Sequence, residues 1–426
     1  MIPPVDVSAA SNAAEQQWRL ARQLLAREDR DSAMPLLQRA AEAGLLEAQF
    51  DLGRMLLYFP QDAAERQRGQ QWLATAETRG HGGAAYLLAV LSLGERLEPF
   101  DARQLASRVL HGARCGYRLA LRALGLHWGR FGDAGLQNLS ALCLEHAALA
   151  GDLVSMALLG ERLATGTLGC AHDPQRALAI FALAHKAGLP VPAPAAVIDA
   201  NLAGPIDLPP LPDVLPMPDF APAFAIAAPD LRCEKPHVVI VEDILSAEEC
   251  RFVVLLGGGL VKPSTTASPS GELVHVDIRT SHEMVFEPDR EDLSLRLVQR
   301  RMAAAAGLPL ANGEWLTLLR YTPGQEYREH RDYLPPSSIK PLAQGGPGQR
   351  LATAIAYLNP LPAGAHTVFP LLGLDLAPAP GSVLVFRNLD DNGLPDPQTL
   401  HAGRPVASGV KWICTLWLHQ AAFRPL

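Results

Sequence analysis

The spacing of apolar and polar positions changes character twice along the chain. Residues 13 to 188 are rich in Ala and Leu and have the pattern of one helix after another. Residues 189 to 236 lose this period and are crowded with proline, and from His237 onward short apolar runs alternate with Gly and Pro turns. The pattern predicts a multidomain α + β chain with helices at 1–188, a Pro-rich linker at 189–236 and a strand-rich domain at 237–426.

The helical region contains an internal period. Glycines that can end helices recur every 35 to 37 residues, and a small residue stands four positions before each of them. They are Gly44, Gly80, Gly116, Gly151 and Gly188. Glycine ends a helix in the left-handed conformation that other residues avoid, and small residues let helices approach closely. The period predicts a solenoid of helix pairs, in which each unit buries its apolar face only against its neighbours.

The stretch AAEAGLLEAQFDLG, residues 40–53, resembles the Sel-one-like repeats, which are relatives of the tetratricopeptide repeat. About four to five such units fit the region. One interpretation is a scaffold that only stabilises the chain. The other is a concave face that binds a protein partner or presents a substrate, because solenoids expose extended surfaces.

The linker at 189–236 is not expected to form regular helix, because proline fixes φ and removes backbone donors. Apolar residues interrupt the prolines, among them Val197, Ile198, Phe220 and Phe224. We expect them to hold parts of the linker against one of the domains. A PxxP segment that binds a partner is the alternative.

The C-terminal region predicts short strands and two helices. Ser246 and Glu249 have the spacing of a capping box, so a helix is expected to begin there, and a second helix is expected at 294–305. Strands are expected at 237–245, 274–278, 281–286, 315–321, 352–358, 382–386 and 410–419. Many short strands in one domain favour a sandwich or a barrel.

Two histidines and one aspartate are the candidate metal ligands. His330 and Asp332 stand two residues apart, so an extended backbone places both side chains on one face. His401 completes a set of two imidazoles and one carboxylate, which suits Fe(II) in non-haem oxygenases and leaves coordination positions open. Taken alone, the His-x-Asp pair is more simply a surface charge pair.

A lysine follows the third candidate ligand. Lys411 lies in an alternating run, from Lys411 to His419, that predicts a strand. A cation on an inward strand face is costly unless an anion meets it, and an acid co-substrate would be such an anion. Tyr357, on the strand face of Thr353 and Ile355, is a candidate for lining the same pocket.

Several short motifs stand in a fixed order around these residues. They are Arg279-Thr280-Ser281, Arg320-Tyr321, His330-x-Asp332, Tyr357-Leu358-Asn359, Thr367-x-Phe369-Pro370 and His401-x-Gly403-x-Pro405-Val406, followed by Gly409, Lys411-Trp412 and Trp417. From about 235 to 426 the chain resembles the catalytic domain of 2-oxoglutarate- and Fe(II)-dependent dioxygenases of the prolyl 4-hydroxylase type. The resemblance implies a double-stranded β-helix, a jelly-roll or cupin-like fold, with helices that buttress one sheet.

The resemblance also implies roles and cofactors. Lys411 would pair with the distal carboxylate of 2-oxoglutarate, and Tyr321 and Thr367 would bind the same group. Fe(II), 2-oxoglutarate and dioxygen would be required, with ascorbate as a candidate reductant. The implied reaction is hydroxylation of a peptide or protein side chain, proline being favoured by the resemblance alone. The alternatives are a hydroxylase of a free amino acid or small metabolite, and an interaction scaffold with an inactive oxygenase domain.

Some residues and motifs remain open at this stage. Arg279 is a candidate for either a substrate contact or a structural contact. His366 stands where the resemblance leads one to expect an acidic residue, and its role is undetermined. His419 is most simply an ordinary, half-buried histidine.

Composition narrows the class of protein. With 426 residues, 48% hydrophobic and 19% charged, the chain is globular and long enough for two or three domains. A net charge of −7 argues against nucleic-acid binding. The six cysteines contain no CxxC pair, which favours neither a disulfide framework nor a zinc site. With no secretory signal or membrane-spanning run in the sequence, we expect a cytoplasmic protein.

Overall fold

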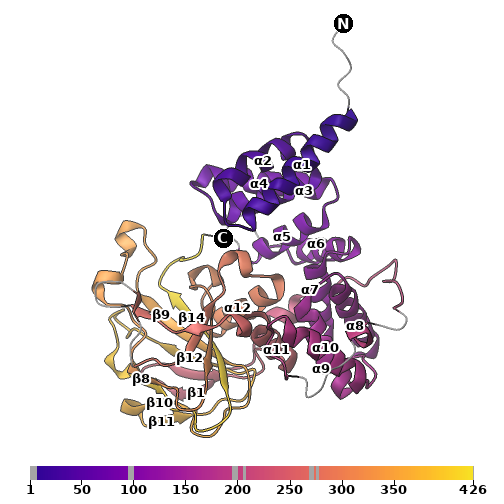
Figure 1. Ribbon diagram of the computed structural model, residues 1–426. Helices are drawn as coiled ribbons and strands as arrows, with labels where there is room; N and C mark the ends of the chain where they lie inside the picture. Colours follow the sequence, from indigo (N-terminus) through magenta and orange to yellow (C-terminus); the bar gives the residue numbers. More distant parts are fainter. Residues whose placement is uncertain are drawn as a thin grey trace.

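The computed structural model describes residues 7–94, 100–193, 200–204, 208–267, 273–274 and 278–425. Its N-terminal part is a stack of helices in which each helix packs against the next (Figure 1). The helices are α1 Val7–Leu25, α2 Arg30–Glu42, α3 Leu46–Tyr58, α4 Ala63–Thr78, α5 Gly82–Ser92, α6 Ala102–Arg114, α7 Arg118–Gly129, α8 Ala134–Leu149, α9 Leu153–Thr165 and α10 Pro174–Lys186. None of the described helices is both long and apolar enough to cross a bilayer.

Aspartate and glycine set the ends of these helices. An N-cap aspartate accepts the backbone N–H three residues later at the start of α2, α4, α8, α9 and α10. The five periodic glycines all have φ between 71° and 88°, in the left-handed region, just beyond helix ends. The predicted helical repeat is therefore confirmed. The first four glycines each precede the second helix of a pair, and Gly188 follows the end of α10.

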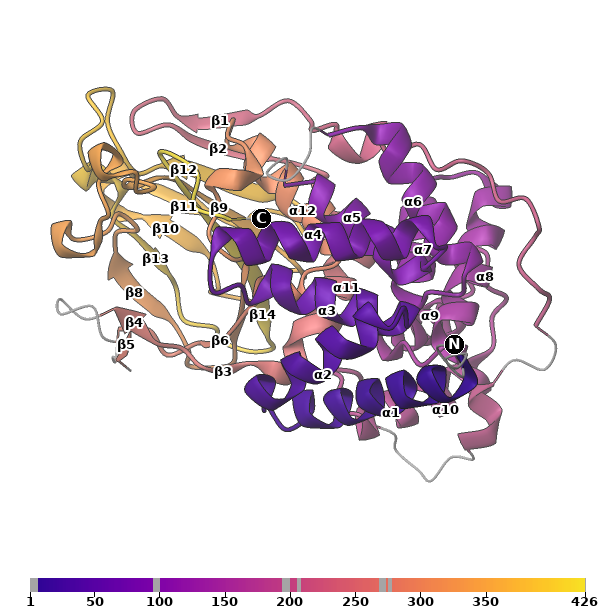
Figure 2. The ribbon, with the colours of Figure 1, turned by 90° about the horizontal axis from the view of Figure 1, so that it is seen from above.

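The C-terminal part is built on two antiparallel sheets (Figure 2). The larger has the order β1-β2-β12-β9-β14-β7-β6-β3 and the smaller the order β11-β10-β13-β8, while β4 and β5 form a separate pair. The strands are β1 Asp230–Cys233, β2 Val238–Val241, β3 Lys262–Pro263, β4 Thr266–Ala267, β5 Leu273–Val274, β6 His282–Val285, β7 Thr317–Tyr321, β8 Tyr327–His330, β9 Arg350–Tyr357, β10 Thr367–Phe369, β11 Leu374–Leu376, β12 Val383–Arg387, β13 His401–Gly403 and β14 Lys411–His419. The predicted two-sheet fold is confirmed.

Side chains alternate between the two faces of the larger sheet. Ile355, Tyr357 and Ile413 face the smaller sheet and share a core with Phe369 and other residues of that sheet. Their neighbours, such as Ala354, face the opposite way, toward two helices. On β9 the helix-facing residues are the alanines Ala352, Ala354 and Ala356, while the neighbouring strands contribute larger side chains such as Leu416 and Val385 to the same cluster.

Those two helices lie between the sheet and the solenoid (Figures 1 and 2). They are α11 Ala247–Gly257, which begins with the predicted capping box of Ser246 and Glu249, and α12 Leu293–Ala305. One apolar cluster contains residues of the sheet, of both helices and of α7 to α10. The helical and strand-rich regions therefore share a core.

The linker differs from its prediction in one respect. Asp230–Cys233 forms an edge strand paired with β2, so the sheet begins inside the segment that we assigned to the linker. Prolines on either side of this short, exposed strand hide its pattern in the sequence. As predicted, Phe220 is buried against the helices, and Phe224 packs beside it. Val197 and Ile198 lie outside the described residues.

Candidate active site

The three predicted metal ligands meet between β8 and β13. His330 ends β8 and His401 begins β13, and the antiparallel register sets these residues opposite each other. Asp332 follows β8 by two residues. One ligand atom of each side chain lies within 4.8 Å of the others, and no second cluster of this kind occurs among the described residues. The structure thus brings the predicted ligands together.

Both imidazoles point Nε2 toward the aspartate. Nδ1 of His330 lies 2.8 Å from the carbonyl oxygen of Arg328, and Nδ1 of His401 lies 3.0 Å from that of Thr399. Donation by each Nδ1 leaves Nε2 free, 3.5 Å and 3.8 Å respectively from carboxylate oxygens of Asp332. A hydrogen bond of this kind fixes the tautomer and orientation of a metal-ligating histidine.

The charges of these groups also suit a metal. Burial, helped by the nearby His330, lowers the pKa of His401 to about 4, so its imidazole is neutral at neutral pH. Burial raises the pKa of the Asp332 carboxyl, but the two imidazoles outweigh it and hold that pKa well below its usual range. One carboxylate and two imidazoles form a donor set that fits Fe(II).

A second layer of buried polar groups orients the aspartate. The hydroxyl of Thr353, on β9, donates to Oδ2 of Asp332 at 2.8 Å. The side-chain amide of Asn388 donates to the Thr353 hydroxyl at 3.0 Å. Thr353 and Asn388 are both fully buried, so water cannot replace these contacts.

The variant Thr353→Val keeps the shape of the threonine and removes its donor. We expect iron affinity to fall by about 10-fold, within the 10–100-fold range usual for loss of a partner that orients a metal ligand. Titration of the metal-free protein with Fe(II) under nitrogen measures the change. Unaltered affinity in a folded variant would show that the hydroxyl has no part in holding Asp332.

Lys411 and two of its predicted companions line a small cavity beside the ligands. The cavity measures about 40 Å³ and contains Lys411, Tyr321, Thr367 and the three metal ligands in its wall. Lys411 is 2% exposed, and its ammonium donates to the carbonyl of Ala365 at 2.8 Å, its sole hydrogen-bond partner among the described residues. Tyr321 is its cross-strand neighbour.

The fourth predicted contact, Tyr357, lies one layer back. Its hydroxyl is 2.7 Å from that of Thr367, and its ring centroid is 5.8 Å from the Lys411 ammonium. It is absent from the described residues that form the cavity wall. Tyr357 therefore supports Thr367, and its direct contact with a co-substrate stays a prediction.

Burial lowers the pKa of Lys411 to about 8. Below that pH the ammonium can pair with a dianionic co-substrate, and above it the amine is neutral. For 2-oxoglutarate, the co-substrate that the sequence resemblance implies, we therefore expect the affinity of the protein to fall as pH rises through about 8. Isothermal titration from pH 6.5 to 9.5 measures this, and the variant Lys411→Met should bind weakly and lose the slope. An affinity that rises with pH in this range would contradict the assignment.

Three residues outside the predicted set extend the site. Arg350 pairs with both carboxylate oxygens of Glu314, at 2.5 and 2.8 Å, and donates to the backbone carbonyl of Asp332 at 3.3 Å. His419 Nε2 lies 2.8 Å from the same carboxylate. His419 thus has a specific partner beside the metal centre. Glu314 lies 36 residues from Arg350 and 105 from His419, so no local spacing could have indicated this group.

The two residues of undetermined role are placed differently. Arg279 lines the cavity, where its guanidinium pairs with Glu283 at 2.7 Å and lies 5.2 Å from the ring of Tyr327. His366 is instead 40% exposed, with Nδ1 2.6 Å from Asp375, and is not part of the cavity wall. Arg279 therefore belongs to the site, and His366 lies outside it.

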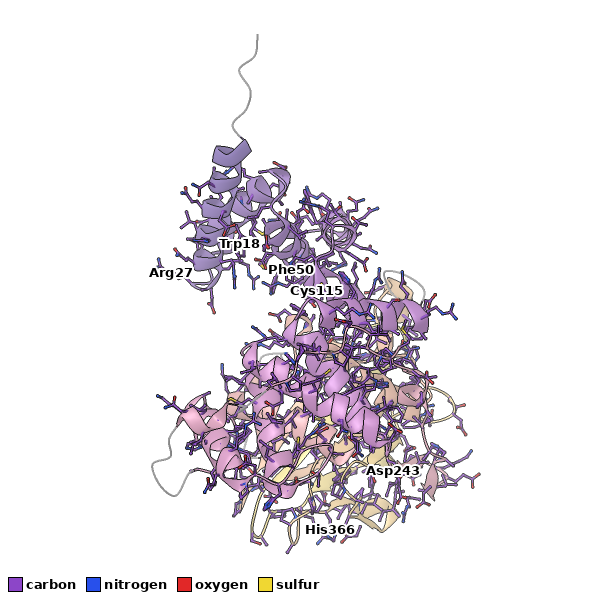
Figure 3. The ribbon with its side chains drawn as sticks, turned by 90° about the vertical axis from the view of Figure 1, so that its right-hand side faces the viewer. Trp18, Arg27, Phe50, Cys115, Asp243 and His366 are labelled. Carbon is purple, nitrogen blue, oxygen red and sulfur yellow. The ribbon has the colours of Figure 1, made fainter. Side chains whose placement is uncertain are left out.

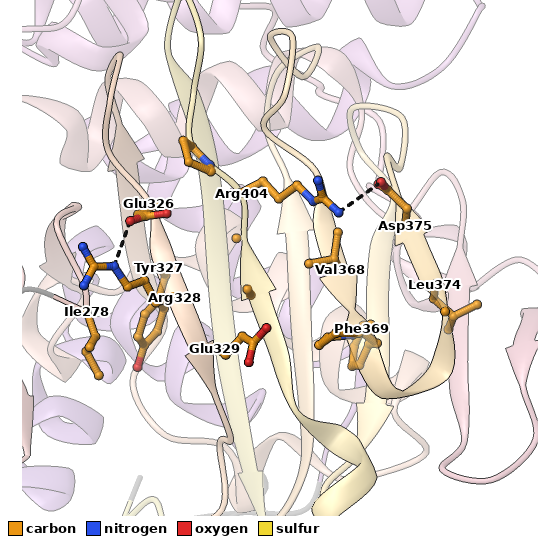
Figure 4. A pocket seen from close by; sticks show the side chains of 15 residues that line it. Ile278, Glu326, Tyr327, Arg328, Glu329, Val368, Phe369, Leu374, Asp375 and Arg404 are labelled. Atoms are coloured by element: carbon orange, nitrogen blue, oxygen red, sulfur yellow. Dashed lines mark hydrogen bonds and ion pairs between the residues drawn. The ribbon is translucent and has the colours of Figure 1, made fainter.

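A larger groove of about 880 Å³ opens on the smaller sheet, and Tyr327 and Gly403 line both it and the cavity. Figure 4 shows the side chains of the groove, with the ion pairs of Arg328 with Glu326 and of Arg404 with Asp375. The remaining side chains are mostly apolar, such as Ile278, Val368 and Leu374. This open groove has apolar and charged walls.

Relatives of known type match the part of the chain that contains this site. Residues 316–419 match the model of the 2OG-Fe(II) oxygenase superfamily. Probable prolyl 4-hydroxylase 7 of Arabidopsis thaliana is 35% identical over 207 residues, 44% of this chain and 64% of its own length. Prolyl 4-hydroxylase 1 of the same plant is 31% identical over 209 residues, 46% of this chain and 72% of its own length. Probable prolyl 4-hydroxylase 6 of Arabidopsis thaliana is 35% identical over 208 residues, 44% of this chain and 70% of its own length.

Solved structures give matches to both halves. A viral collagen prolyl hydroxylase from Paramecium Bursaria Chlorella virus-1 is 27% identical, covers 42% of this chain and 94% of that chain, and has a TM-score of 0.33. A Sel1 repeat protein from Oxalobacter formigenes is 21% identical, covers 41% of this chain and 73% of that chain, and has a TM-score of 0.34.

The matched oxygenase segment contains the four residues that define the site, namely the three ligands and Lys411. Among the curated relatives, four that are more than 30% identical are covered over more than two thirds of their own length. The chain therefore belongs to the prolyl 4-hydroxylase family of 2OG-Fe(II) oxygenases.

Proposed function

We propose that this protein hydroxylates a proline side chain of a peptide or protein, most simply at C4, with Fe(II), 2-oxoglutarate and dioxygen. The observation that carries the proposal is the buried ammonium of Lys411 in the same cavity wall as His330, Asp332 and His401. A cation buried with one hydrogen bond requires an anionic partner, and the distal carboxylate of 2-oxoglutarate supplies one.

Each residue of the site has a defined task in this reaction. His330, Asp332 and His401 would hold the iron, which supplies the capacity to oxidise an unactivated C–H bond with dioxygen. Lys411 binds the distal carboxylate of the co-substrate, a charge-assisted contact worth roughly 1.5–3 kcal/mol. Thr367, oriented by Tyr357, adds a hydroxyl to the same end of the cavity.

The groove favours a polypeptide substrate over a free amino acid. Its volume of about 880 Å³ exceeds what a single proline needs, and Tyr327 and Gly403 line both the groove and the cavity. Apolar patches suit proline rings, and the ion pairs on its walls offer polar contacts to a peptide backbone. The groove is the structural feature that favours the proposal of a peptide or protein substrate.

The solenoid offers a second surface for recruitment. A hollow of about 590 Å³ lies along α1, α3, α5 and α7 and includes Trp18, Phe50 and Tyr117. Trp18 and Phe50 lie on neighbouring helices at the end of the molecule opposite to His366 (Figure 3). Partly exposed aromatic side chains are frequent anchors at protein interfaces. We assign this hollow to a protein substrate or a partner that presents one.

Two further properties complete the proposal. Ascorbate would act as the reductant that keeps the iron ferrous between turnovers. The protein would work in the cytoplasm, and its six free cysteines, three of them buried, fit a reducing compartment.

Release of succinate tests the proposed function. Purified protein with Fe(II), 2-oxoglutarate, ascorbate and proline-containing peptides should release succinate in proportion to hydroxyproline found by mass spectrometry. Turnover on free proline but not on peptides would favour the metabolite reaction. Absence of decarboxylation under every condition would favour the inactive scaffold.

A further inference from the structure

A continuous series of buried and half-buried ion pairs and hydrogen bonds joins the metal centre to the solenoid. Its first members are described above: Arg350 donates to the backbone of Asp332 and pairs with Glu314. Beyond Glu314 the series continues through the segment after β14. The reaction as proposed uses none of the residues of that continuation.

Arg424 is the junction of the series. It is 1% exposed, and its Nε and Nη2 donate to the backbone carbonyls of Gly313 and Glu314, at 3.0 and 2.6 Å. Its Nη1 donates to Glu291 at 2.9 Å and to Gln299 at 2.8 Å. One planar guanidinium thus donates to two consecutive backbone carbonyls. It fixes the backbone at Glu314, the residue whose carboxylate pairs with Arg350.

The far end of the series lies in the solenoid. Glu291 also accepts a hydrogen bond from Nε of Arg296, on α12, at 3.0 Å. Nη1 of Arg296 donates to the carbonyl of Val90, on α5, at 3.3 Å. Glu291, Arg296 and Arg424 are all buried, so solvent does not weaken these contacts.

We propose that Arg424 is a positioning residue for the metal centre and couples it to the solenoid. Arg424 fixes the backbone at Gly313 and Glu314 and thereby the position of the Glu314 carboxylate. That carboxylate orients the guanidinium of Arg350, which holds the backbone of Asp332 in place. Lysine cannot make this contact, because one ammonium lacks the planar fork that reaches two carbonyls and two side chains at once. The inference rests on the iron site proposed above.

Binding of Co(II) in place of iron tests the coupling without any turnover. Metal-free wild type, Arg424→Lys, Arg424→Gln and the control Arg232→Gln, an exposed arginine on β1, are titrated with Co(II), and the visible absorption of the bound ion is recorded. Because Asp332 is held less firmly, we expect both Arg424 variants to bind Co(II) roughly ten-fold more weakly than wild type and to show a shifted spectrum. This is the lower end of the range for losing a group that orients a metal ligand. The control should match wild type.

The outcomes separate this inference from the proposed function. If wild type takes up no Co(II), the metal site itself fails. If wild type binds and folded Arg424→Lys binds equally well with an unchanged spectrum, the metal site stands and the positioning role is wrong. A lower melting temperature with unchanged Co(II) affinity would likewise show a purely structural arginine.

Wild type alone provides a second measurement, which does not depend on whether the variants fold. The amides of Phe423 and Arg424 both donate to the carbonyl of Ala311. Since coupling is reciprocal, Co(II) should slow hydrogen exchange at these two amides while leaving the edge strand β1 unchanged. Equal exchange at Phe423 and Arg424 with and without Co(II) would overturn the inference.

Discussion

The variant His401→Ala is expected to abolish succinate release and hydroxylation together. His401 is one of the three residues of the cluster, and its Nε2 faces Asp332 while its Nδ1 bonds to the Thr399 carbonyl. Losing a metal ligand should reduce activity more than losing a group that only orients a ligand. We therefore expect activity to fall more than about 100-fold. Activity and iron content are measured on the same preparation.

The control for this variant is His185→Ala, which removes an exposed histidine at the end of α10. It should retain both iron and activity. Iron bound at wild-type stoichiometry by His401→Ala, with normal turnover, would remove the basis for the proposed metal centre. Loss of activity with full iron content would instead assign His401 a role other than holding the metal.

The variant Arg122→Ala is expected to destabilise the whole protein by about 3–5 kcal/mol, the usual cost of removing one partner from a buried ion pair. Arg122, on α7, is 4% exposed and pairs with Asp152 at 2.5 Å and with Asp292 at 2.6 Å. These aspartates cap α9 in the solenoid and α12 beside the sheet. Both carboxylates would be left buried without their cation, and the free energy of unfolding in urea measures the loss.

The matched control is Arg118→Ala, one turn earlier on α7, because Arg118 is exposed. It should change the free energy of unfolding by less than about 0.5 kcal/mol. Because the two regions share a core, we expect wild type to unfold in one transition. Two separate transitions, with Arg122→Ala affecting neither midpoint, would show that the regions are independent.

The shared core affects how the solenoid can serve the enzyme. Arg162 of α9 pairs with Glu248 at the start of α11, and the hydroxyl of Tyr86 on α5 accepts the Leu293 backbone N–H at the start of α12. The solenoid therefore holds the N-terminal ends of both helices that back the larger sheet. A partner in its hollow would lie at a fixed position relative to the metal centre.

Local spacing along the chain is enough to predict several elements and part of the chemistry. The glycine period predicted the helix ends, the Ser246 and Glu249 pair predicted the start of α11, and the alternating run from Lys411 predicted β14. The pair His330 and Asp332 predicted two ligands on one face. Each of these signals depends on neighbours in the chain, whose relative positions the backbone geometry fixes.

Which buried faces meet became known only from the three-dimensional structure. The pattern of an amphipathic helix predicts which face is buried but not which element that face packs against. The sequence therefore did not predict the core that α7 to α12 share with the sheet. The same holds for the Glu314, Arg350 and His419 group and for Arg424, whose partners lie 36 to 133 residues away. No spacing rule links such residues, because the path of the whole chain brings them together.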